Sequence, residues 1–62
     1  MEELKVRFNK IYAGLPLGLR NDIVVVIDPD GPITWHAAYI EVYNNTDKGK
    51  EILGKLAELE II

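Results

Sequence analysis

Residues 23–43 have the sequence IVVVIDPDGPITWHAAYIEVY, and the fold that we predict is organised around this stretch. It opens with an uninterrupted run of β-branched apolar residues, Ile23 to Ile27. Such a run is typical of a strand that is covered on both faces. The DPDGP segment at residues 28–32 forms a tight turn, because proline presets φ and glycine accepts the positive φ that follows. We therefore predict a β-hairpin over residues 23–43, with Asp28 opposite Pro32 and Val25 opposite Trp35.

The second half of this stretch predicts a strand that changes phase. Its apolar residues fall at odd positions up to Ala37 and at even positions from Ala38 onwards. Because a shift of one residue turns every side chain of a strand to the other face, we predict a β-bulge near Ala37 and Ala38. The alternative is a strand that tolerates both faces. The bulge puts one group of residues on the core face: Ile23, Val25, Ile27, Ile33, Trp35, Ala38, Ile40 and Val42. It leaves the opposite face to Val24, Val26, Thr34, His36, Tyr39, Glu41 and Tyr43.

The first fifteen residues fit two patterns. Apolar and polar residues alternate over residues 3–9, which indicates a strand. One helical face would instead gather Leu4, Phe8, Ile11, Tyr12 and Leu15. We predict the strand, because a two-stranded hairpin alone is marginally stable and gains from a third strand. The helix remains the alternative for residues 3–15.

The C-terminal segment predicts a helix over about residues 46–59. Asn45 or Thr46 is a suitable N-cap, and Asp47 favours the first turn. The apolar residues at helical spacing form one stripe: Ile52, Leu53, Leu56 and Leu59. Together these elements predict a single small α+β domain, residues 1–62. It would consist of a three-stranded, mainly antiparallel sheet with the C-terminal helix packed on one face.

The composition excludes several kinds of chemistry. The chain contains neither cysteine nor serine, so disulfides, cysteine zinc sites and the usual thiol or hydroxyl nucleophiles are excluded. His36 is the only histidine and there is no glycine-rich phosphate loop, so we predict no metal site, no cofactor and no enzymatic activity. The N-terminus does not resemble a secretory signal, which predicts a cytoplasmic protein. The frequent lysine, glutamate and isoleucine suggest a thermophilic source.

The predicted sheet has one face that no predicted element covers, and this predicts self-association. One helix shelters one face of a sheet, so the other face of the predicted hairpin needs a second copy of the chain. We therefore predict a homo-oligomeric interaction module, in its simplest form a dimer. The interface candidates are Val24, Val26, His36, Tyr39, Tyr43, Ile61 and Ile62.

Two alternative functions use polar residues. A ligand-binding or minimal catalytic site could form near His36, Tyr39 and Glu41, since a general base needs an orienting partner. A nucleic-acid accessory protein could use the basic N-terminal residues Lys5, Arg7, Lys10 and Arg20. The formal net charge of −3 disfavours nonspecific binding of nucleic acid. No sequence feature predicts a membrane partner.

Overall fold

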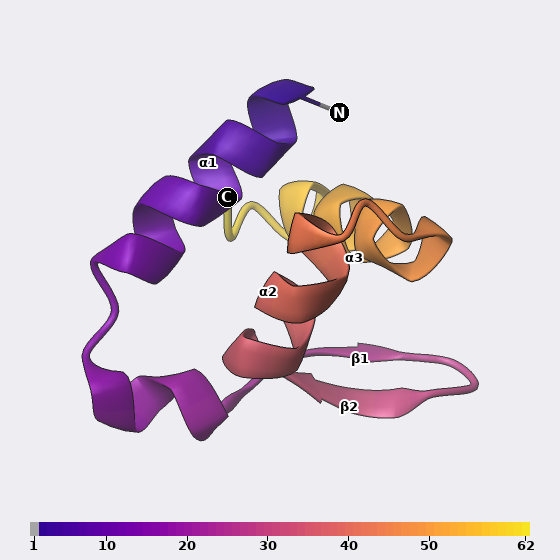
Figure 1. The fold of residues 1–62 in the computed structure, drawn as a ribbon. Coiled ribbons are helices and arrows are strands. Elements are labelled where there is room, and N and C mark those ends of the chain that lie inside the picture. The colour runs from indigo at the N-terminus through magenta and orange to yellow at the C-terminus, as the bar shows by residue number, and fades with distance from the viewer. Residues whose placement is uncertain (1) are drawn as a thin grey trace.

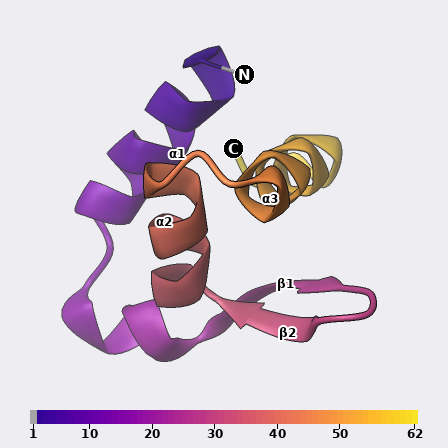
Figure 2. The same ribbon diagram turned by 45° about the vertical axis from the view of Figure 1, so that its right-hand side comes forward.

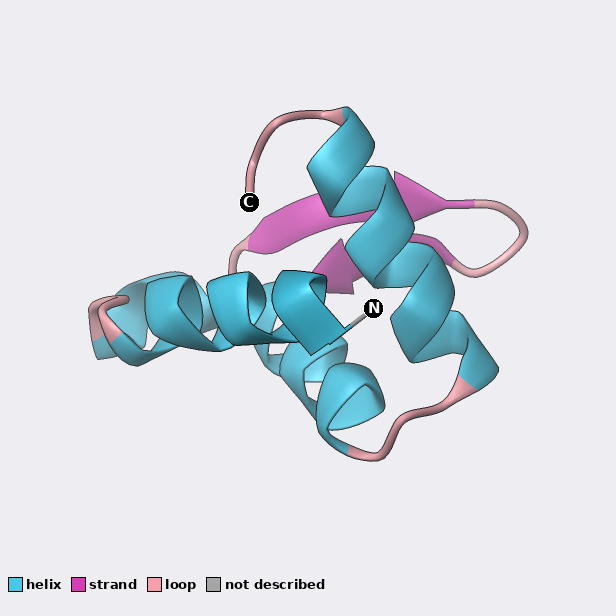
Figure 3. Cartoon of the chain, turned by 90° about the horizontal axis from the view of Figure 1, so that it is seen from above, coloured by secondary structure: helices cyan, strands magenta, loops and turns pink. Residues whose placement is uncertain are grey.

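The computed structural model describes residues 2–62 and shows an α+β fold (Figure 1). In chain order its elements are α1 (Glu2–Ala13), the 3₁₀ helix η1 (Leu17–Asn21), β1 (Ile23–Ile27), β2 (Gly31–Thr34), α2 (Trp35–Tyr43) and α3 (Asp47–Glu58). The two strands form one antiparallel sheet. Helix α3 lies over this hairpin, as the view from above also shows (Figure 3), and α2 stands between α1 and α3 (Figure 2). The α+β class and the C-terminal helix are confirmed.

The predicted N-terminal strand is wrong, because residues 2–13 form helix α1. Its inward face carries Phe8 and Tyr12, both buried, and the partly buried Leu4. Spacings of four residues place these side chains on one side of a helix. Two further features stabilise the helix: acidic residues in the first turn, and an ion pair of 2.8 Å between Glu3 and Arg7, four residues apart. The alternation over residues 3–9 is therefore a by-product of the helical period.

The predicted second strand and its bulge are also wrong beyond Thr34. Residues 35–43 form helix α2, which starts directly after β2. Thr34 is the N-cap, and its Oγ1 accepts a hydrogen bond of 3.1 Å from the N–H of Ala37. The change of phase is a helical period, because Trp35, Ala38 and Val42 lie at positions i, i+3 and i+7. Ala38 and Val42 are buried and Trp35 is partly buried.

The hairpin is confirmed, but its register differs from the prediction. Ile27 pairs with Gly31, and Val25 pairs with Ile33 and not with Trp35. The turn is therefore residues 28–30, and Gly31 adopts its positive φ of 84° on the ladder itself. The expected pairing of Asp28 with Pro32 fails because Pro32 lies opposite Val26. The irregularity of the sheet falls in β1, between Ile23 and Val25.

The core lies between the inner face of the hairpin and the three helices. Its buried residues are Phe8, Tyr12, Val25, Ile27, Ile33, Ala38, Val42, Ile52, Leu53 and Leu56. Three of the four residues of the predicted α3 stripe are among them, whereas Leu59, at the helix end, is exposed. Two predicted core residues, Ile23 and Ile40, are exposed as well. Ile23 precedes the irregularity in β1, and Ile40 lies on the outer side of α2.

The C-terminus is held by a Schellman motif at the end of α3. The N–H of Ile61 donates to the carbonyl of Leu56 at 2.9 Å, and the N–H of Glu60 donates to the carbonyl of Ala57 at 3.0 Å. Glu60 adopts a φ of 60°, a conformation that glycine accepts at a lower free energy. The motif turns the chain back, so that Ile62 packs against the core.

The joint between α2 and α3 depends on a glycine. Gly49 is buried at the start of α3, and a Cβ there would clash with the backbone carbonyl oxygen of Glu41. A Cβ at Gly54 would meet no heavy atom within 4 Å. Gly49 is therefore required for the close approach of the two helices, whereas Gly54 is not.

Substitutions at these two glycines should have opposite effects on stability. Gly49→Ala should lower the free energy of unfolding by about 1–3 kcal/mol, because the backbone of α2 must move. Gly54→Ala should raise it by up to about 1 kcal/mol, because alanine favours a helix interior. Urea unfolding followed by circular dichroism measures both. Equal effects of the two substitutions would contradict the placement of α3 against α2.

A second pair tests the C-terminal motif. Glu60→Gly should raise the free energy of unfolding by about 1 kcal/mol, because it relieves the left-handed conformation. Glu58→Gly, two residues earlier at the last residue of α3, should lower it by up to about 1 kcal/mol. Thermal unfolding of both variants makes the comparison. A destabilising Glu60→Gly would show that the motif does not form.

Candidate binding surfaces

A groove with a volume of about 660 Å³ lies between α1 and α2. Helix α1 contributes the lining residues on one side of the groove, which are spaced four and three positions apart along the helix. The other lining residues belong to η1 and α2. The lining residues are Lys5, Asn9, Tyr12, Ala13, Arg20, His36, Tyr39 and Tyr43. Pockets that bind small molecules have volumes of roughly 300–1,000 Å³. The α1–α2 groove is thus of the right size for a small ligand.

A ladder of aromatic rings leads from the core into this groove. The buried Phe8 stacks on Tyr12 with a centroid distance of 6.0 Å. Tyr12 stacks almost parallel on Tyr39, with centroids 4.4 Å apart and planes at 8°. Tyr43 continues the ladder at 5.9 Å from Tyr39, and 65% of its surface is exposed. The rigid inner rings therefore support one ring that is open to solvent.

The charged groups of the groove are all basic. The guanidinium of Arg20 lies over the Tyr12 ring, 4.6 Å from its centroid, and Lys5 Nζ donates to Asn45 Oδ1 at 2.7 Å. Arg20 Nε is buried and has no hydrogen-bond partner among residues 2–62. No carboxylate lines the groove, although the chain carries a net charge of −3. The groove is therefore a positive region on an acidic protein.

The predicted ligand set is only partly brought together. His36 and Tyr39 both line the groove, and His36 Nδ1 lies 3.5 Å from the hydroxyl of Tyr12. Glu41 lies apart from them, because its carboxylate accepts a hydrogen bond of 2.6 Å from the Thr46 hydroxyl at the α2–α3 joint. His36 therefore has no carboxylate to orient it as a general base in this arrangement.

The predicted nucleic-acid residues do not form one surface. Lys5 and Arg20 line the groove. Arg7 instead pairs with Glu3, and Lys10 is exposed outside the groove. Only half of the predicted basic set therefore lines the groove.

Three residues of the groove, namely Asn9, Tyr12 and Ala13, were not among the predicted site residues. All three belong to α1, which we predicted as a strand over residues 3–9. The signal that could have found two of them is the spacing of Lys5, Asn9 and Tyr12, which places these residues on one helical face.

The predicted interface residues fall in three places. Val26 lies on the outer face of the hairpin with 59% of its surface exposed, whereas Val24 is partly buried and packs against the core. On this face Val26 lies opposite the exposed Pro32, and Ile23 is also 59% exposed. The other candidates lie elsewhere: His36, Tyr39 and Tyr43 at the groove, Ile62 packed against the core, and Ile61 exposed.

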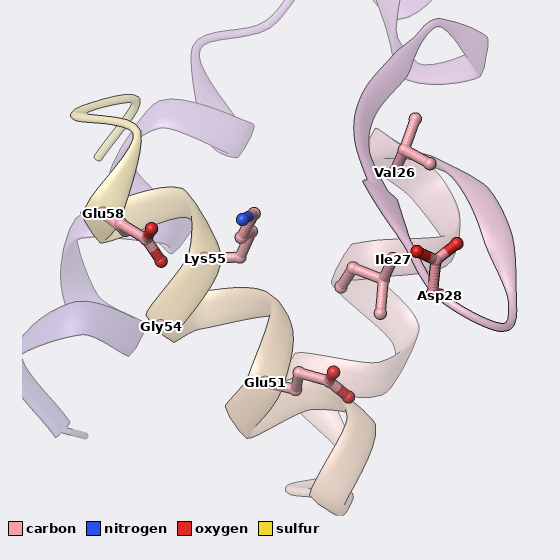
Figure 4. A pocket seen from close by; sticks show the side chains of 7 residues that line it. All are labelled: Val26, Ile27, Asp28, Glu51, Gly54, Lys55 and Glu58. Atoms are coloured by element: carbon pink, nitrogen blue, oxygen red, sulfur yellow. The ribbon is translucent and has the colours of Figure 1, made fainter.

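A smaller cleft, of about 410 Å³, separates β1 from α3 (Figure 4). Val26 and Ile27 both line the cleft, and in this view the side chain of Ile27 points towards α3. The charged residues of the cleft are Asp28, Glu51, Lys55 and Glu58, which makes it acidic. Within residues 2–62 no group of three histidine or carboxylate side chains is arranged to hold a metal ion.

None of the helices formed by residues 2–62 is both long and apolar enough to span a membrane. Comparisons of the chain with protein-family models, with curated proteins and with solved structures find no match. The function of these surfaces is therefore inferred from their shape and chemistry.

Proposed function

We propose that the chain is a homodimeric interaction module in which the outer face of the β1–β2 hairpin packs on the same face of a second copy. The observation that supports this proposal is the exposure of Ile23 and Val26, 59% each, in a two-stranded sheet. Figures 1 and 2 show α3 on one side of the hairpin and no helix of residues 2–62 on the other. The face that the helices leave open is apolar.

Burial of this face would be favourable. Apolar surface removed from water contributes about 25 cal/mol per Å². The outer face presents Val26, its cross-strand neighbour Pro32, and Ile23. An isolated two-stranded hairpin is at best marginally stable; here the helices cover its inner face, and a second layer on the outer face would bury further apolar surface.

An interface of standard size would use a limited part of the surface of this chain. A stable interface buries about 800 Å² on each partner, which is about a fifth of the 4040 Å² surface of this chain. Helix η1 lies at the same end of the molecule as the hairpin (Figures 1 and 2). It adds the exposed Leu17 and Leu19 to the apolar surface. A twofold axis would bring both copies of these residues together.

The size of the chain supports the same proposal. A domain of 62 residues without cysteine has no disulfide to compensate for a small core, and oligomerisation is a common solution. A cytoplasmic location fits the absence of cysteine, and a thermophilic source fits the frequent lysine, glutamate and isoleucine. Both remain parts of the proposal.

A charge placed on the hairpin face should dissociate the dimer. Val26→Lys would bring two ammonium groups to an apolar twofold interface, where burying a charge is strongly unfavourable. The matched control is Val6→Lys, because Val6 is an exposed valine on α1, outside the hairpin. Sedimentation equilibrium at micromolar concentrations should give a dimer for the wild type and Val6→Lys, and a monomer for Val26→Lys.

Two results of this experiment would count against the proposal. A wild-type chain that is a stable monomer at micromolar concentrations would remove the dimer itself. A Val26→Lys variant that is folded and still dimeric would place the interface on another surface.

A further inference from the structure

We infer that the α1–α2 groove binds a small molecule that joins a planar ring to an anionic group, of the nucleoside monophosphate class. Lys5, Arg20 and Asn9 would contact the anionic group, and the exposed ring of Tyr43 would stack on the planar ring. This inference does not depend on the dimer, because the hairpin face uses none of the groove residues.

The charge of the groove selects an anion. Lys5 and Arg20 approach it from α1 and η1, and no lining residue carries a carboxylate. The two carboxylate ion pairs formed by residues 2–62 use other cations, since Arg7 binds Glu3 and Lys48 binds Asp30. Two cations without a carboxylate partner in a concave site are a favourable environment for a phosphate group.

Arg20, which lines the groove, carries a buried donor without a partner among residues 2–62. Its guanidinium is positioned over the Tyr12 ring, yet its buried Nε has no hydrogen-bond partner among residues 2–62. A buried donor without a partner is unfavourable and is uncommon in folded proteins. The oxygen atoms of a phosphate group would supply acceptors for this guanidinium, which binds phosphate in a planar, bidentate manner.

The aromatic ladder selects a planar ring. Tyr12 and Tyr39 already stack on each other, so they form a fixed wall. Tyr43 is tilted by 35° from Tyr39 and is mostly exposed, which leaves its ring free to stack on a base. Stacking on an aromatic side chain strengthens the binding of any base, because every base has a flat π face. The groove thus offers contacts for the charge and for the ring of one molecule.

The direct test is a titration of the full chain with adenosine monophosphate, followed by the ¹H–¹⁵N NMR signals of the backbone. We expect saturable shifts at residues of α1, η1 and α2 that line the groove. Adenosine, which lacks the phosphate, and inorganic phosphate, which lacks the ring, should each bind at least tenfold more weakly, because each loses one set of contacts.

Two matched pairs of variants locate the site. Lys5→Met and Arg20→Met should each weaken adenosine monophosphate about tenfold, because each removes a charge-assisted contact. Lys10→Met and Arg7→Met remove the same charges outside the groove and should leave the affinity unchanged. Tyr43→Ala, at an exposed position, should weaken adenosine monophosphate but leave inorganic phosphate unaffected, and so tests the ring if Arg20→Met does not fold.

The inference is overturned by any of three results. The first is that adenosine monophosphate at millimolar concentration gives no saturable shifts of the backbone signals. The second is that Lys10→Met and Arg7→Met weaken binding as much as the variants of the groove, which would mean nonspecific attraction of the anion to positive charge. The third is that a short single-stranded oligonucleotide binds far more tightly than the mononucleotide and independently of Tyr43, which would assign the surface to nucleic acid.

Discussion

The capping of α2 by Thr34 is the interaction on which the rest of the structure depends. The chain leaves β2 at Thr34 and enters α2 at Trp35 without a loop. The Thr34 hydroxyl accepts the N–H of Ala37, and the N–H of Trp35 donates to the carbonyl of Asp22 at 3.1 Å. These two bonds satisfy backbone donors that a new helix leaves unpaired, and the second ties α2 to the end of η1.

The residue at which α2 starts also determines which neighbour each side of the helix contacts. One side buries Ala38 and Val42 in the core. Another side carries His36 and Tyr43 into the groove with α1. Glu41 turns to the α2–α3 joint, where Thr46 bonds both its carboxylate and its backbone carbonyl. If the helix began one residue later, each side chain of α2 would be turned by about 100° around the helix axis and would face a different neighbour.

The sequence allowed the presence of the hairpin and of the C-terminal helix to be predicted, because each carries a local signal, whereas the predicted register across the turn was wrong. The five β-branched residues, the DPDGP turn and the Thr46 cap are of this kind. The residues after Thr34 were assigned to a strand because aromatic and β-branched residues favour strands and a phase change fits a bulge as well as a helix. Only packing decides between the two, because both place Ala38 and Val42 in the core, whereas the helix leaves Ile40 exposed and the bulged strand would bury it.

The same ambiguity limited the prediction of the groove. His36 and Tyr39 could be found because aromatic and titratable residues stand out in a short chain. Tyr12 could not be placed beside them while residues 3–9 were assigned to a strand, although its ring lies 4.4 Å from Tyr39. The two proposed surfaces differ in chemistry for a physical reason. The hairpin leaves apolar residues outside because α3 covers only one face, whereas the groove gathers cations because α1 and η1 contribute Lys5 and Arg20.

The most direct test is therefore the conformation of residues 35–43 in solution. Backbone NMR assignment gives the Cα and Cβ chemical shifts of this segment, and nuclear Overhauser effects report distances between aromatic rings. We expect helical shifts from Trp35 to Tyr43, together with cross-peaks between the rings of Tyr12 and Tyr39. Extended shifts continuing from Thr34 to Val42, without contacts between these rings, would contradict the fold and the groove together.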